Sequence, residues 1–88
     1  MRTIIGLLAS ALVLTAALAA EQEFDQNCAN GLAEFGVKFK TNCKVNWSDP
    51  DSGKTYCFSS EAARESFLRD PAANICKAQQ MYSELKDE

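Results

Sequence analysis

The chain of 88 residues contains no histidine. Histidine is the usual general base of enzymes and the commonest metal ligand, so its absence excludes histidine-based catalysis and histidine-liganded metal sites. The sequence also lacks a Cys-x-x-Cys pair and a glycine-rich phosphate-binding loop, and it shows no internal repeat. Together these absences predict a protein without enzymatic activity.

Charge is nearly missing from the first twenty positions, where Arg2 is the only charged residue. An uncharged apolar run follows it, and Ala17-Leu18-Ala19 forms the small-x-small pattern of a signal cleavage site. The run is at the lower limit for a membrane span and is rich in alanine, which favours a cleaved signal over an anchor. No cysteine stands at the cleavage point, which argues against a lipoprotein. We therefore expect a signal peptide over residues 1–20 and an exported, periplasmic or secreted, domain over residues 21–88.

Basic residues are the minority among the charged ones, with 9 Lys and Arg against 12 Asp and Glu. The formal net charge is −3, and loss of Arg2 with the signal makes the domain more acidic still. Nucleic acids and anionic membranes attract basic surfaces. We therefore expect no nucleic-acid partner and no membrane contact after signal cleavage, whereas a protein partner stays open.

All four cysteines lie in the expected exported domain, at Cys28, Cys43, Cys57 and Cys76. Four cysteines in a short exported chain usually form two disulfides, and a small core benefits from such cross-links. Cysteine thiolates are also the preferred ligands of soft metal ions. The cysteine count favours disulfides over a metal site, and it leaves the pairing open.

The N-terminal part of the domain carries a helical pattern followed by a strand pattern. Apolar residues recur at helical spacing within Glu21–Phe35, which predicts an amphipathic helix or helical turn that ends at Gly36. The apolar positions of this helix are Phe24, Cys28, Leu32 and Phe35. The alternation over Val37–Lys40 then predicts a short strand.

A β-hairpin is predicted in the middle of the domain. The β-rich runs Lys44–Trp47 and Thr55–Phe58 flank Ser48–Gly53, which is dense in turn-forming residues. If the numbers of paired residues have an even sum, Cys43 and Cys57 share one face. An odd sum places Cys43 on the face of the aromatic residues and Cys57 on the opposite face. We favour the odd register because it builds the better apolar face, and under it we expect Cys57 to pair with a residue beyond the hairpin.

Two consecutive helices are predicted after the hairpin. Ser60 is a helix-capping residue, and Asp70-Pro71 starts a second helix that extends to about Lys86. The core-facing positions of these helices are Ala63 and Phe67, which can pack with Phe58, and then Ile75, Ala78, Tyr82 and Leu85. The sequence therefore predicts an α+β fold, a small single domain in which the hairpin is packed by an N-terminal helical segment and two C-terminal helices.

The run Gly53–Ser60, followed by Phe67 and Asp70-Pro71, resembles the YHS domain. This family comprises small treble-clef-like modules associated with heavy-metal handling. Upstream, Cys28-Ala29-Asn30-Gly31 resembles the family's opening motif, a cysteine with a glycine three residues later. The resemblance covers about Cys28–Ile75. Two further family cysteines are replaced here, by Ser59 and Ala63, so only Cys28 stands at a family ligand position.

Two functions follow as expectations. The resemblance implies a module that binds or handles a soft metal ion, copper or zinc, through Cys28, Cys43 and Cys57. The alternative is a disulfide-stapled, metal-free accessory domain that binds a protein partner or a small ligand. The resemblance also implies that Cys28 folds back toward the hairpin and lies close to Cys57, with Cys43 as the third member. We expect Cys76 to be a buried thiol or to pair with the remaining cysteine.

The signal peptide can be tested by intact-mass analysis of protein from the exported fraction. We expect the mature chain to begin at or near Ala20 or Glu21, because the small-x-small pattern ends there. A full-length chain that retains Met1 in the membrane fraction would show an uncleaved anchor instead.

Overall fold

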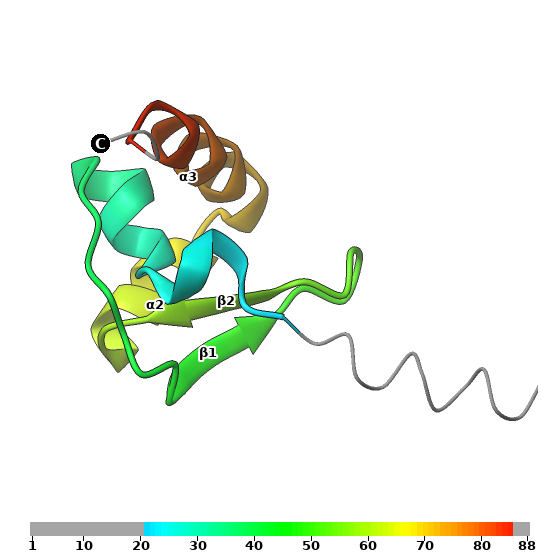
Figure 1. The fold of residues 1–88 in the computed structure, drawn as a ribbon. Helices are drawn as coiled ribbons and strands as arrows, with labels where there is room; N and C mark the ends of the chain where they lie inside the picture. Colours follow the sequence, from blue (N-terminus) through cyan, green and yellow to red (C-terminus); the bar gives the residue numbers. More distant parts are fainter. Residues whose placement is uncertain (1–20, 86–88) are drawn as a thin grey trace, which may run out of the picture.

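The computed structural model describes residues 21–85, so the predicted signal peptide lies outside the described residues. Its elements are the short helical turns η1 and η2, the strands β1 and β2, and the helices α2 and α3 (Figure 1). Their bounds are Glu23–Gln26 for η1, Gly31–Phe35 for η2, Val45–Ser48 for β1, Thr55–Phe58 for β2, Glu61–Leu68 for α2 and Pro71–Leu85 for α3. The predicted α+β fold is confirmed. Within residues 21–85, no helix has both the length and the apolar character needed to cross a membrane.

Strands β1 and β2 form the predicted antiparallel hairpin. Val45 pairs with Phe58 and Trp47 with Tyr56, so the paired numbers have an odd sum and the favoured register is confirmed. The turn is closed by Asp49, whose carboxylate accepts hydrogen bonds from the Asp51 N–H and the Ser52 hydroxyl, both at 3.0 Å. The register places Tyr56 and Phe58 on the face that forms the core.

The helical segment predicted over Glu21–Phe35 is not one continuous helix, because it divides into the two short helical turns η1 and η2. Phe24, Asp25 and Gln26 have positive φ angles of 58°, 53° and 64°, and residues with L chirality in that region cannot continue a right-handed helix. Tertiary hydrogen bonds hold this turn, because the Gln26 carbonyl accepts from both the N–H and the hydroxyl of Thr41, at 3.0 and 2.9 Å. The helical segment resumes only at η2, which ends at Gly36 as predicted, with φ at 65°.

The strand predicted over Val37–Lys40 is also wrong. This segment is extended, but its ladder is reduced to one isolated bridge, between Asn27 and Lys40. Phe35, which the helical pattern placed on the apolar face, is 65% exposed, and Phe39 of the extended segment is 53% exposed. The reason is that the apolar core is already covered by η2 and α3, so neither ring has an inner face to occupy.

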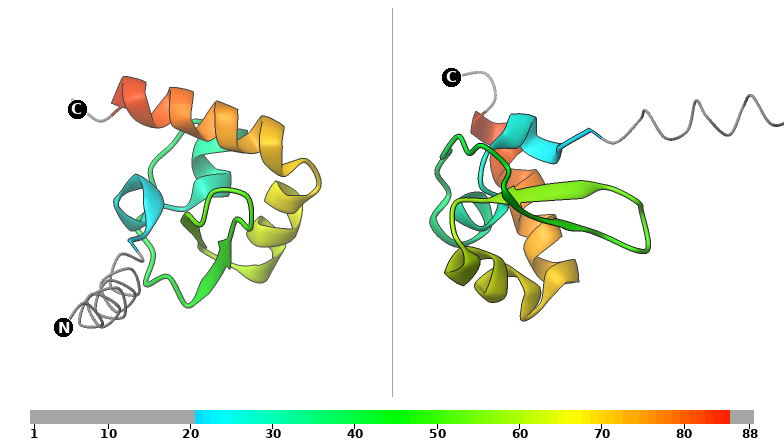
Figure 2. Two further views of the ribbon diagram at one scale, coloured as in Figure 1. Left: turned by 90° about the vertical axis from the view of Figure 1, so that its right-hand side faces the viewer. Right: turned by 90° about the horizontal axis from the view of Figure 1, so that it is seen from below.

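Helices α2 and α3 close the core on the other side. Ser60 caps α2 by accepting a hydrogen bond from the Ala63 N–H at 3.1 Å, as predicted. Phe67 of α2 is fully buried, with its ring centroid 5.2 Å from Phe58 and 5.9 Å from Tyr56. Helix α3 packs mainly against η2 and crosses above the hairpin (Figure 2). Its predicted apolar face, Ile75, Ala78, Tyr82 and Leu85, contacts the core.

Removal of the Phe67 ring should destabilise the domain strongly. We expect Phe67→Ala to lower the free energy of unfolding by about 3–5 kcal/mol, because it leaves a cavity beside the rings of Tyr56 and Phe58. Phe35→Ala is the matched control, and since Phe35 is mostly exposed it should change stability little. Urea denaturation followed by Trp47 fluorescence measures both, and equal midpoints for the two variants would show that α2 is not docked through Phe67.

Candidate functional site

Three of the four cysteines gather around β2. Cys43 and Cys57 form a disulfide, with their Cα atoms 4.8 Å apart. The expectation that Cys57 pairs beyond the hairpin is therefore wrong. Cys43 precedes β1 and has a φ of 61°, so the alternation of the strand does not extend to it and its side chain turns toward Cys57. The predicted strand register is confirmed, but the strand alternation does not continue from Val45 back to Cys43, two residues earlier.

The second disulfide expected from the cysteine count is not formed. Cys28 is a free, buried thiol, and Cys76 is a free, exposed one. The expectation that Cys76 is buried or paired is wrong for a geometric reason. The core-facing stripe of α3 passes through Ile75 and Ala78, and the next residue along a helix is rotated by about 100° from its predecessor. Cys76 therefore lies on the solvent side of α3.

Cys28 lies beside the disulfide, as the resemblance implied. Its backbone forms an isolated parallel bridge with Cys57. The Cys28 sulfur accepts a hydrogen bond from the Ser59 N–H at 3.3 Å, and its thiol donates to the Ser59 hydroxyl at 3.6 Å. The predicted proximity of Cys28 and Cys57 is thus confirmed for the backbone, while the sulfur of Cys57 is bonded to Cys43.

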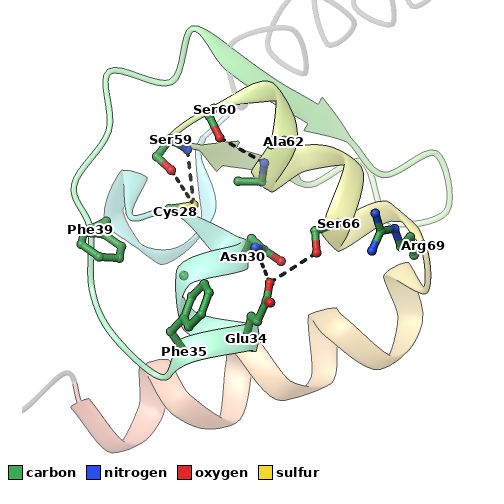
Figure 3. Close-up of a pocket in the computed structure, with 12 residues that line it drawn as sticks. Cys28, Asn30, Glu34, Phe35, Phe39, Ser59, Ser60, Ala62, Ser66 and Arg69 are labelled. Atoms are coloured by element: carbon green, nitrogen blue, oxygen red, sulfur yellow. Dashed lines mark hydrogen bonds between the residues drawn. The ribbon is translucent and has the colours of Figure 1, made fainter.

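A cavity of about 430 Å³ opens above Cys28, between η2, the extended segment that follows it and the N-terminal half of α2 (Figure 3). We refer to it as the Cys28 cavity. Its apolar side is formed by the rings of Phe35 and Phe39, and its opposite end by Arg69. The remaining wall comes from α2 and the two residues before it, and from η2 and the residue before it, namely Ser59, Ser60, Ala62, Ala63, Ser66, Asn30, Gly31 and Glu34.

Gly31 allows Phe39 to lie over the cavity. A Cβ atom at position 31 would come within 2.9 Å of the Phe39 ring and 3.4 Å of the Val37 carbonyl oxygen. The contact with the ring is shorter than Cβ atoms tolerate, so any larger residue would displace the Phe39 ring. The glycine of the Cys28-to-Gly31 motif therefore has a steric role here, at the place where the chain passes over η2.

The polar side of the Cys28 cavity is built on Glu34. Its Oε1 atom accepts hydrogen bonds from the Asn30 amide at 2.9 Å and from the Ser66 hydroxyl at 3.3 Å, which joins η2 to α2. Asn30 is buried and satisfied by this bond. Arg69 forms no ion pair with any residue of the described part of the chain, so its guanidinium is available to an anionic group.

The arrangement of sulfurs does not fit a resident metal ion. Soft metals bind deprotonated thiolates, and the sulfurs of Cys43 and Cys57 are joined to each other. That leaves Cys28 as the one thiol near β2, with Ser59 as its neighbour. Across residues 21–85 there is no group of three cysteine or acidic side chains placed to hold a metal ion.

Two ionisable side chains outside the cavity have shifted pKa values. Burial raises the pKa of Tyr56 above its usual value, and the nearby charges of Glu23 and Asp49 add to this. A hydrogen bond from Lys40, together with its positive charge, lowers the pKa of Asp25. Both groups serve the fold, since Tyr56 lies in the core and the exposed Asp25–Lys40 pair joins η1 to the extended segment.

Sequence reasoning found the sulfur cluster but missed most of the cavity. Phe35 and Phe39 were assigned to packed elements, and Glu34, Ser66 and Arg69 carried no motif. Among the aromatic residues of the hairpin, Tyr56 is fully buried, and Trp47 stacks on it with the ring centroids 6.0 Å apart. The one sequence signal that touches the cavity is the Cys28-to-Gly31 motif. A comparison of the chain with protein families, with curated proteins and with solved structures gives no match.

The Cys43–Cys57 disulfide should contribute substantially to stability. It closes a loop of 14 residues, and reduction should lower the free energy of unfolding by about 3 kcal/mol, the size expected for such a loop. Urea denaturation with and without dithiothreitol measures this. In the Cys57→Ala variant neither Cys43 nor Cys28 can form a disulfide with position 57, so dithiothreitol should leave the urea midpoint of this variant unchanged. An equal midpoint for the reduced and oxidised wild type would contradict a stabilising disulfide.

Proposed function

We propose that this protein is an exported, disulfide-stapled, metal-free accessory domain that binds an apolar group in the Cys28 cavity. The observation that carries this proposal is the pair of largely exposed rings, Phe35 and Phe39, that together line one side of a cavity of about 430 Å³. Exposed aromatic rings around a concave surface are characteristic of ligand sites and of sites for a partner's side chain. The apolar group can belong to a small molecule or to a protein partner.

The polar side of the cavity supplies orientation. Glu34 is held in place by Asn30 and Ser66, and Arg69 lies at the opposite end from the rings. A ligand with an apolar body and an anionic end matches this distribution, because its apolar body contacts the rings of Phe35 and Phe39 while its charge faces Arg69. Small-molecule sites commonly combine apolar walls with a few such polar groups.

The resemblance to the YHS domain supports the location of the site. Cys28, Ser59 and Ala63 stand at the positions where that family has its three cysteines, and all three line the Cys28 cavity. With two of the sulfurs replaced by a hydroxyl and a methyl group, the positions that the resemblance assigns to metal ligands surround open space. A YHS-like fold with a ligand cavity in place of a metal site is therefore part of the proposal.

Soft-metal handling through Cys28, Cys43 and Cys57 is the second candidate. The observation in its favour is that Cys57 is adjacent to both other cysteines, through the disulfide and through the backbone bridge. This function requires reduction of the disulfide, which an oxidising compartment opposes. We rank it second for that reason.

Binding of the fluorescent probe anilinonaphthalene sulfonate tests the first candidate, because the probe joins aromatic rings to an anionic group. We expect saturable binding to the folded wild type. Phe39→Ser should weaken it about tenfold, the equivalent of about 1.4 kcal/mol, through the loss of one ring contact. Val37→Ser is the matched control, since Val37 is exposed on the same segment but does not line the cavity, and it should leave the affinity unchanged.

Equal affinities for Phe39→Ser and Val37→Ser would contradict the proposed site. The second candidate has its own readout, which is zinc titration of the wild type before and after reduction. Stoichiometric binding by the reduced protein that disappears in Cys28→Ala would favour metal handling over the metal-free function.

A further inference from the structure

Cys57 has two cysteine neighbours within disulfide reach. Its Cα atom lies 4.8 Å from that of Cys43, to which it is bonded. On its other side its backbone pairs with Cys28 in a parallel bridge. Paired chains in a sheet lie about 4.8 Å apart, and disulfides form between residues with Cα atoms about 4.4–6.8 Å apart. Both neighbours therefore satisfy the backbone condition for a bond to Cys57.

The side chains of Cys28 and Cys57 also share a side of the backbone. Directly paired residues of adjacent strands project to the same face. The contact of the Cys28 sulfur with Ser59, two positions after Cys57, agrees with this placement. Cys28 and Cys57 are 1% and 0% exposed, so both side chains lie in the interior, on the same side of the paired backbones.

We propose that Cys28 exchanges with the Cys43–Cys57 disulfide, so that the domain has two disulfide isomers that share Cys57. The Cys28 thiol loses its proton, and the thiolate attacks the Cys57 sulfur. A Cys28–Cys57 bond forms as the Cys43–Cys57 bond breaks, and Cys43 leaves as a thiolate that takes up a proton. One disulfide and one thiol are present before and after, so the step needs neither an oxidant nor a reductant.

The exchange moves the free thiol from the interior to the surface. Cys43 is only partly buried, and it stands in a segment held by local hydrogen bonds, from its own N–H to the Thr41 hydroxyl and from the Asn46 amide to its carbonyl, at 3.0 and 2.8 Å. Its left-handed backbone, with φ at 61°, is unfavourable for a residue with a Cβ atom. Release from the disulfide lets this segment relax, and it presents a thiol that external disulfides and soft electrophiles can reach.

The consequence for the Cys28 cavity is a change of its floor. In one isomer the floor carries the free Cys28 thiol beside Ser59, and in the other that sulfur is bonded to Cys57. The exchange does not depend on ligand binding, so the experiment that tests it is independent of the experiment that tests the proposed function. It provides a chemical activity, thiol–disulfide exchange within a three-cysteine cluster, that the cavity alone does not supply.

Alkylation of the native protein with iodoacetamide tests the exchange. The Cys76→Ser variant is used so that the exposed thiol of α3 is removed. Lysine and arginine residues separate Cys28, Cys43 and Cys57, so trypsin places them on three different peptides. After labelling and non-reducing digestion, we expect a labelled Cys43 peptide together with a Cys28–Cys57 cross-linked peptide. A labelled Cys28 peptide with Cys43 and Cys57 still joined, and no label on Cys43, would overturn the proposal.

The matched control is Cys28→Ser in the same background, which removes the attacking sulfur. We expect complete loss of the Cys43 label in this variant, and persistence of the label would overturn the proposal. Cys43→Ser gives an independent test that keeps the attacking sulfur. After this variant is refolded from urea in a buffer of reduced and oxidised glutathione, we expect a Cys28–Cys57 disulfide. Free thiols at both positions would show that the two sulfurs cannot bond.

Discussion

The burial of β2 on both of its faces is the constraint on which the rest of the structure depends. On one face, Tyr56 and Phe58 contact Phe67 of α2, and Tyr56 also contacts the ring of Phe24, so this aromatic packing docks both the helix and the N-terminal turn. On the other face, Cys57 is fully covered and is bonded to Cys43. A core this small has few other large groups to bury, so a strand that is buried on both faces contributes much of the stability of the domain.

The proposed site follows from what that strand leaves uncovered. Cys28 lies beside the end of β2. The segments that follow these two strands of backbone, η2 and α2, diverge from that point, and Glu34 forms the polar link between them. Serine and alanine at positions 59 and 63 are too small to fill the space between the two elements. Phe35 and Phe39 are displaced outward because α3 already covers the apolar side of η2. The cavity, its aromatic side and its buried thiol therefore share one structural origin.

Features with a local cause were predictable. The hairpin, the Ser60 cap, the Asp70-Pro71 start of α3 and the apolar face of α3 each depend on residues within a few positions of one another. The odd register was predictable as well, because only that register brings Tyr56 and Phe58 to one face with Val45 and Trp47. The helical periodicity over Glu21–Phe35 is real, since Phe24, Cys28 and Leu32 are all buried. A continuous helix does not form there because a left-handed turn without glycine interrupts it, which the periodicity does not reveal.

The sequence by itself determined the fold class, the strand register and the starts of α2 and α3, since short-range propensity and apolar alternation act along the chain. Tertiary structure alone decided which sulfurs meet, because the left-handed backbone at Cys43 and the bridge between Cys28 and Cys57 join segments that are distant in sequence. It also decided that Phe35 and Phe39 stand exposed beside a cavity. An aromatic residue has the same hydrophobicity in the sequence whether its ring is buried or exposed in the fold. Which of these occurs depends on the elements that pack around it, and these are distant in sequence.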